Sequence, residues 1–154
     1  MDKTATAADI RIRRAQPQDA AEIAALTTQL GHPIEGSSAL LVARQLIGDR
    51  AHVLLVADQG GLVVGFLNLN LRPQLHHAGL VGTIDEMVVD DASRGGGIGA
   101  RLVDAAIEEA VDAGADAIDV ITGTQRVDTQ RFYQNHGFQH VAHMLVHRLG
   151  HSHP

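Results

Sequence analysis

The sequence predicts a single α/β (α+β) domain, and three observations carry that prediction. Its 154 residues are enough to bury one sizeable core. An apolar, β-branched run over 82–90 leads into a glycine-rich turn and then into a helical pattern over 98–113, with apolar residues on one face. Two further apolar runs, 52–58 and 62–71, flank Gln59-Gly60-Gly61, which is typical of a β-hairpin.

Three elements are expected before this hairpin. Residues 10–15 alternate between apolar and basic side chains, which favours a first strand. A proline opens the next segment, and we expect a helix over 17–30 because proline is tolerated in the first turn. A serine, either Ser37 or Ser38, is expected to cap a second helix that runs through Ile47.

The rest of the chain continues this alternation of strands and helices. A loop over 72–79 is expected before the central strand. After the long helix we expect a strand over 116–122 and a short helix over 128–136. Two short strands or one broken hairpin are expected over 138–149. The full order is β-α-α-β-β-β-α-β-α-β(-β). We expect a flexible N-terminus, one folded domain and a frayed tail, over 1–9, 10–149 and 150–154.

Composition excludes several classes of function. The net charge of −6 argues against nucleic acid as a partner. The chain has no cysteine, which excludes disulfides, a thiolate nucleophile and a cysteine-based zinc site. It has no apolar signal core and no apolar run long enough for a membrane helix, so no membrane association is expected and a cytoplasmic location is the default.

The segment from Arg94 to Gly99 reads Arg-Gly-Gly-Gly-Ile-Gly and lies between the central strand and the long helix. A strand, a glycine turn and a helix start together place unpaired backbone N–H groups and the positive end of a helix dipole at one point. Glycine also lets the backbone approach a phosphate without a Cβ in the way. The segment therefore predicts an anion site.

Two segments of the chain resemble the GNAT family of N-acetyltransferases. Arg94, Gly97 and Gly99 match the family's acetyl-CoA motif, Arg/Gln-x-x-Gly-x-Gly/Ala. Phe132-Tyr133, followed by Gly137-Phe138, matches its second motif. The resemblance covers nearly the whole chain, and it implies a mixed, mostly antiparallel sheet with helices on both faces. It also implies acetyl-CoA as co-substrate and no metal.

The resemblance further implies which residues hold acetyl-CoA. In the family, backbone groups of the fourth strand bind the pantetheine amides as an added strand would, and one N–H polarises the thioester carbonyl. The glycine turn and the helix start bind the pyrophosphate. The corresponding residues here are Met87, Val88, Val89, Arg94, Gly95, Gly96, Gly97, Ile98, Gly99 and Ala100.

Three residues are candidates for catalysis. By resemblance, Tyr133 is the general acid that protonates the departing thiolate; the alternative is a core aromatic residue. Asp85 and Glu86 lie in an apolar strand, where carboxylates are costly unless paired or used. Either could hold or deprotonate the acceptor ammonium group. Because successive strand residues point to opposite faces, we expect only one of them to face the site, and we favour Glu86 for its reach. The alternative for this pair is an ion pair with Arg72 or Arg126.

The histidines divide into two sets. His32, His76 and His77 lie in predicted loops that the family places near the acceptor, so they are candidate substrate contacts. The other set has spacings of four, three and four, which would suit a metal only on a continuous helix; it comprises His136, His140, His143 and His147. Gly137 interrupts such a helix, so no metal site is expected.

These observations predict an enzyme that moves an acetyl group from acetyl-CoA to a primary amine of a small molecule or peptide. Direct attack in a ternary complex is expected, because no cysteine is available for an acetyl-thioenzyme. The alternative is a non-catalytic acyl-CoA-binding or sensing domain of the same fold. A dinucleotide fingerprint is rejected, because the glycine turn follows the fourth strand rather than the first. The sequence is compatible with a homodimer. It specifies an amine as the acceptor but not which amine.

Overall fold

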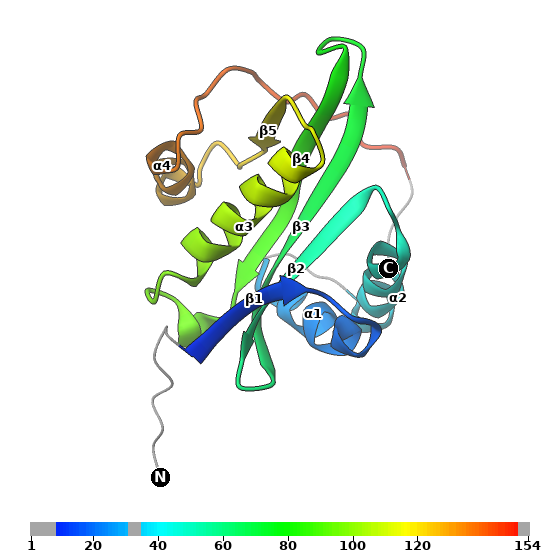
Figure 1. Ribbon diagram of the computed structural model, residues 1–154, viewed down its shortest axis with the longest axis vertical. Coiled ribbons are helices and arrows are strands. Elements are labelled where there is room, and N and C mark those ends of the chain that lie inside the picture. Colours follow the sequence, from blue (N-terminus) through cyan, green and yellow to red (C-terminus); the bar gives the residue numbers. More distant parts are fainter. Residues whose placement is uncertain (1–8, 31–34, 151–154) are drawn as a thin grey trace. The chain divides into compact units, whose positions relative to one another are not determined.

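The computed structural model describes residues 9–30 and 35–150 (Figure 1). The expected flexible start and frayed tail lie almost wholly outside these residues, as does His32. Contacts divide the chain into two compact units, the first ending at Asp119 and the second beginning at Val120, and each is described by itself. Within the described residues, no helix combines the length and the apolar character that crossing a bilayer requires.

The first unit is built on a sheet whose strands are neighbours in chain order, β1-β2-β3-β4-β5. Three of these neighbouring pairs are antiparallel: β1 with β2, β2 with β3, and β3 with β4. The central strands are rich in Val, Leu and Ile, and Leu67 and Leu69 of β3 are fully buried. This confirms the α/β (α+β) class and the mostly antiparallel sheet. The strand bounds are β1 (Ile10–Arg14), β2 (His52–Gln59), β3 (Leu62–Gln74), β4 (Gly79–Val89) and β5 (Ala117–Val120).

Helices cover both faces of this sheet, as predicted (Figure 1). On one face, α1 (Ala20–Leu26) and α2 (Gly36–Gly48) share a core with the inward residues of β2 to β4, among them Phe66. The other face carries α3 (Ile98–Asp112), which packs so closely that a Cβ on Gly65 would lie 3.5 Å from a methyl carbon of Leu102. Successive residues of β3 therefore serve different cores, as the alternation of a strand requires.

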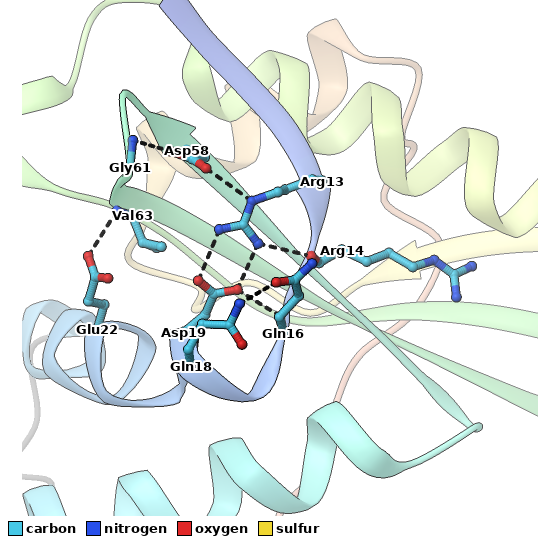
Figure 2. A network of polar contacts seen from close by, with 9 residues as sticks. All are labelled: Arg13, Arg14, Gln16, Gln18, Asp19, Glu22, Asp58, Gly61 and Val63. Carbon is cyan, nitrogen blue, oxygen red and sulfur yellow. Dashed lines mark hydrogen bonds and ion pairs between the residues drawn. The ribbon is translucent and has the colours of Figure 1, made fainter.

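A guanidinium ties β1 to the start of the first helical segment and to β2 (Figure 2). Arg13 donates to both carboxylate oxygens of Asp19, at 2.7 and 3.0 Å, and to Asp58 at 3.1 Å. Asp19 also accepts the backbone N–H of Gln16 at 2.7 Å, although it is only 4% exposed. The hydrogen bond from Arg13 is the main reason why the pKa of Asp19 lies below its ordinary value.

Two local predictions are wrong. The expected loop over 72–79 shrinks to 75–78, because β3 and β4 stay paired as far as Gln74 and Gly79. Pro73 lies inside the paired part of β3, where proline is rare, so the local sequence does not indicate a strand there. The expected serine cap of α2 is also absent: the helix begins after Glu35, and Ser37 Oγ donates to the Glu35 carboxylate at 2.7 Å instead of bonding the helix backbone.

The second unit contains α4 (Val127–Asn135), close to the predicted helix. The strands predicted over 138–149 are not present in the described structure. Apolar side chains of this segment, such as Val141 at 86% and Leu145 at 94%, are exposed. The sequence pattern identified a segment with strand-like character, but a strand also needs a neighbour to complete its backbone hydrogen bonds.

Candidate active site

The predicted anion site has the backbone geometry that it requires. Gly95 and Gly97 adopt φ values of +85° and +80°, in the left-handed region that glycine tolerates best. A Cβ on either residue would meet no atom within 4 Å, so conformation and not space selects glycine here. Gly97 is the N-cap of α3, whose 15 residues direct the positive end of their dipole at this turn, and no side chain caps it.

Two side chains hold the segment between β4 and this turn. Arg94 donates from Nε to the Val89 carbonyl at 3.1 Å and forms an ion pair with Asp91 at 2.9 Å. The amide of Gln29 donates to the Asp90 carboxylate at 2.8 Å and accepts the Asp91 N–H at 3.0 Å. Arg94 is thus engaged with its own chain. Sequence reasoning missed Gln29, because its partners lie about 60 residues away and no local pattern signals the contact.

The end of β4 is paired on one side and extends past its shorter neighbour. Met87, Val88 and Val89 oppose residues of β3. On the other side β5 has four residues against eleven in β4, and the N–H of Asp116 meets the Leu80 carbonyl near the beginning of β4. A helical crossover such as α3 favours parallel strands, so β5 accompanies the first part of β4 and ends before Met87.

A β-bulge in β4 changes the prediction for the two carboxylates. Asn68 opposes Glu86 and Leu69 opposes Ile84, which leaves Asp85 as the extra residue. The bulge breaks the simple alternation on which the expectation of a single site-facing carboxylate rests, so alternation does not decide between Asp85 and Glu86. Glu86 accepts from Asn68 Nδ2 at 2.8 Å, and Asp85 interacts with Asn70, the next residue on the same face of β3. Both side chains therefore lie on the face covered by α1 and α2.

Burial raises the pKa of both carboxyl groups. For Asp85, His52, Arg72 and a hydrogen bond to Asn70 act in the opposite direction without cancelling the effect of burial. For Glu86, the negative charge of Asp85 adds to the effect of burial, while the Asn68 amide opposes it. Among the described residues, the basic group nearest to Asp85 is the imidazole of His52, with Nε2 3.8 Å from Oδ2, and Arg72 does not come within ion-pair distance.

Sequence reasoning overlooked the polar neighbours of this pair. Asn68 and Asn70 are two residues apart in an otherwise apolar strand, so the period of a strand places both on one face, and His52 opposes Asn70 in the register. That spacing was a usable signal. Asn68 and Thr83 are only 2% and 3% exposed, and their side-chain oxygens find no hydrogen-bond partner within the described structure. Buried polar groups without a partner are uncommon in a core, so these two oxygens need another explanation.

Tyr133 lies on α4 in the second unit and is 5% exposed. Its ring packs edge-to-face on Phe132 and Phe138, with centroids 5.1 and 5.4 Å away. Burial raises the pKa of Tyr133 to about 12, while Arg126 opposes the shift. The hydroxyl keeps its proton at neutral pH, as an ordinary tyrosine does, and the raised pKa makes it a weaker acid.

The histidines predicted as substrate contacts divide between described and undescribed residues. His76 and His77 are exposed in the turn between β3 and β4, with their rings 5.2 Å apart. His32 is outside the described ranges. Across 9–30 and 35–150, no three His, Asp or Glu side chains gather in a way that would hold a metal ion.

Comparison with known proteins places this arrangement in a family. The chain is 39% identical over 97 residues to the aminoalkylphosphonate N-acetyltransferase of Salmonella typhimurium, a match that covers 63% of this chain and 62% of that protein. The chain thus spans under two thirds of the length of that relative. A transcriptional regulator from Bacillus halodurans C-125 matches in structure with a TM-score of 0.80 and 29% identity, over 91% of this chain and 99% of the other.

A second solved structure has the same fold at lower identity. The aminoglycoside N-acetyltransferase AAC(6')-Iy in complex with CoA matches with a TM-score of 0.81 and 18% identity, over 92% of this chain and 95% of the other. The model of the acetyltransferase (GNAT) family matches residues 18–138, which include the glycine turn, the bulge and Tyr133. The chain therefore belongs to the GNAT family of acetyltransferases.

Proposed function

We propose that this protein transfers an acetyl group from acetyl-CoA to a primary amine of a small molecule or peptide, by direct attack in a ternary complex. The observation that carries the proposal is the order of features along one strand. Two carboxylates with raised pKa values stand at the bulge of β4, and the same strand leads into a positive-φ glycine turn at the start of α3. One strand thus offers an ammonium site and an anion site.

The chain has suitable groups for both ends of the co-substrate. The turn and the first residues of α3, Gly95 to Ala100, offer backbone N–H groups to the pyrophosphate. Arg94 supports that turn through Val89 and Asp91. The edge of β4 at Met87–Val89, past the end of β5, offers backbone groups to the pantetheine amides in the manner of an added strand.

Side chains of the protein transfer two protons in the reaction, one from the acceptor ammonium and one to the departing thiolate. Glu86 and Asp85 bind the acceptor ammonium, and one of them takes its proton. The free amine then attacks the thioester carbonyl carbon as the carbon–sulfur bond breaks, and Tyr133 donates its proton to the thiolate. The raised pKa values of the two carboxyl groups fit the role of base, because they strengthen the carboxylates as proton acceptors. For Tyr133 the support is its place in the family's second motif, since its hydroxyl is protonated at neutral pH with or without the shift.

We favour a small-molecule amine as the acceptor, with a peptide amine as the alternative. The Salmonella relative is named for an aminoalkylphosphonate, so we choose such compounds as the first probes. His76 and His77, exposed in the β3–β4 turn, and His32 remain proposed contacts for the acceptor. Asp85 and Glu86 would receive its ammonium group.

The decisive experiment is a thiol-release assay with acetyl-CoA and a panel of amines. The panel should contain aminomethylphosphonate, aminoethylphosphonate, an aminoglycoside and a lysine-containing peptide. Acceptor-dependent thiol release, with an acetylated amine identified by mass spectrometry, would support the proposal. If CoA binds but no amine in any class is acetylated, the chain is better explained as a non-catalytic acyl-CoA-binding or sensing domain.

A matched pair of glycine variants tests the anion site separately. Gly97 and Gly114 both have φ of +80°, and a Cβ on either would meet no atom within 4 Å. Valine at the two positions therefore introduces similar backbone strain, but only Gly97 is in the proposed phosphate turn. Gly97→Val should abolish the thermal stabilisation that CoA gives, and Gly114→Val should retain it. Equal stabilisation of both variants would contradict the anion site.

A further inference from the structure

His52 lies between the bulge carboxylates and the surface. Its Nε2 is 3.8 Å from Asp85 Oδ2, and its Nδ1 is 3.3 Å from Asp49 Oδ2. The imidazole is 16% exposed, the Asp85 carboxylate 33% and the Asp49 carboxylate 49%. The ring therefore connects a carboxylate on the sheet face with one at the protein surface, and each ring nitrogen faces a different carboxylate.

An open pocket adjoins the outer side of this ring. It has a volume of about 430 Å³ and lies where α2 ends and β2 begins. Its charged walls carry both signs, from Arg14, Asp49, Arg50, His52, Glu109 and Asp112. His52 Nδ1 itself is buried and has no hydrogen-bond partner within the described residues, and Asp49 Oδ2, 3.3 Å away, lies between it and the solvent of the pocket.

The other charged groups around Asp85 are less suited to moving a proton outward. Arg72 of β3 lowers its pKa electrostatically, whereas Asp119 of β5 raises it. A guanidinium stays protonated at all working pH values, so Arg72 is no acceptor. Glu86 is the more buried of the two carboxylates, and burial and the charge of Asp85 raise its pKa. Imidazole has two nitrogens, one able to accept a proton while the other releases one.

We propose that His52 relays the acceptor's proton from the bulge carboxylates to Asp49 and the solvent of the pocket. The proposal rests on the proposed function, because it concerns the proton that the ammonium group loses. That proton passes from nitrogen to Asp85, directly or through Glu86. His52 accepts it on Nε2 and releases the proton of Nδ1 to Asp49, whose carboxylate is 49% exposed and passes the proton to solvent. Asp85 is then ionised for the next acceptor. The 3.8 Å gap is within the reach of one bridging water.

Kinetics of His52→Gln test the relay. In weak buffer we expect turnover to fall about tenfold, less than for loss of a general base, because water can still remove the proton slowly. Added imidazole should restore most of the lost turnover, since a small base in the open pocket replaces the side chain. Asp49→Asn, at the surface, should show a smaller loss with the same dependence on imidazole. His147→Gln, an exposed histidine of the second unit, is the control and should not change turnover.

A loss that imidazole does not restore would assign His52 a structural role, and unchanged turnover would overturn the relay outright. A second measurement needs no acceptor. His52 lowers the carboxyl pKa of Asp85 in the wild-type protein, so NMR titration of His52→Gln should find that pKa higher still. An unchanged carboxyl titration would overturn the coupling. If the wild-type protein acetylates no amine, the proposed function fails while this titration still decides whether His52 and Asp85 act together.

Discussion

Two sets of carboxylates in the first unit differ in the groups that they contact. Asp19 and Asp58 share the guanidinium of Arg13, and their pKa values lie below the ordinary range (Figure 2). Asp85 and Glu86 instead meet amides and an imidazole, and burial raises their pKa values. The first set carries its own permanent cation, whereas the second does not.

This difference separates carboxylates that hold the fold from carboxylates that remain available for a ligand. A charge-assisted bond to arginine fixes an aspartate in one state over the physiological pH range. A half-buried carboxylate pair without such a partner gains from any cation that arrives, and a protonated amine is a cation of the right size. The missing guanidinium at the bulge therefore favours a binding site, and four substitutions can test this comparison.

The largest effect is expected from Glu86→Gln. The change keeps the shape and an oxygen for the Asn68 amide, but it removes the charge and the basic oxygen. If Glu86 is the base, kcat should fall by about 10²- to 10³-fold and the acidic limb of the rate–pH profile should disappear. If it only binds the ammonium group, acceptor KM should rise while kcat largely survives. Asp85→Asn is the matched comparison: damage there with none at Glu86 would reverse the assignment.

Tyr133→Phe should have the next largest effect. It preserves the edge-to-face packing on Phe132 and Phe138 but removes the proton that the departing thiolate would take. Turnover should fall by about 10²-fold, with acetyl-CoA affinity little changed, when the chemical step limits the rate. Near wild-type turnover across the pH range would leave Tyr133 as a core aromatic residue.

The sequence predicted the order of the elements from β1 to α4, because hydrophobic period and turn residues are local signals; the strands expected over 138–149 are absent from the described structure. The glycine turn was predictable for the same reason, because glycine is the residue that adopts a positive φ most readily. The hairpin end around Pro73 was not, because backbone pairing with β4 outweighed the local preference of proline.

The candidate site was predicted only in part. Both carboxylates were identified as anomalies in an apolar strand, but the bulge that places them on one face depends on the register with β3. Strand register depends on the pairing with β3, so the residues next to Asp85 in the sequence do not reveal it. His52 and Gln29 were missed because their partners lie more than 30 and about 60 residues away. The spacing of Asn68 and Asn70 was the one local signal left unused.

Asp19→Asn should weaken the fold where changes at the bulge do not. It removes the charge that Arg13 contacts twice and leaves Asp58 as the carboxylate partner of that guanidinium, beside the Arg14 carbonyl. We expect unfolding free energy to fall by about 2–3 kcal/mol. The effect should be full above pH 3.8 and vanish as the pH falls through the lowered pKa of Asp19, because the wild-type protein then loses the same charge. Urea titrations at pH 7 and pH 3 measure this. Glu109→Gln, which breaks the more exposed pair with Arg14, is the control and should change stability by about 0.5 kcal/mol or less.

The smallest effect, and the one of opposite sign, is expected for the stability of Asp85→Asn and Glu86→Gln. A carboxyl group with a raised pKa in the folded state disfavours folding while it is ionised, so neutral replacements should leave the protein as stable or more stable at pH 7. We expect a gain of about 1 kcal/mol or less, because both side chains retain amide partners and some contact with solvent.

The expected pH dependence of this stability difference is opposite in sign to that of Asp19→Asn. As the pH falls through the raised pKa values, the wild-type carboxyls become neutral and the difference from the variants should disappear. Thermal unfolding from pH 7 down to pH 4 would follow it. A loss of stability at pH 7 comparable to that of Asp19→Asn would show that the bulge carboxylates are also part of the structural framework, and the distinction between the two sets would fail. A gain in stability together with loss of turnover would instead identify the pair as groups that the fold retains for chemistry.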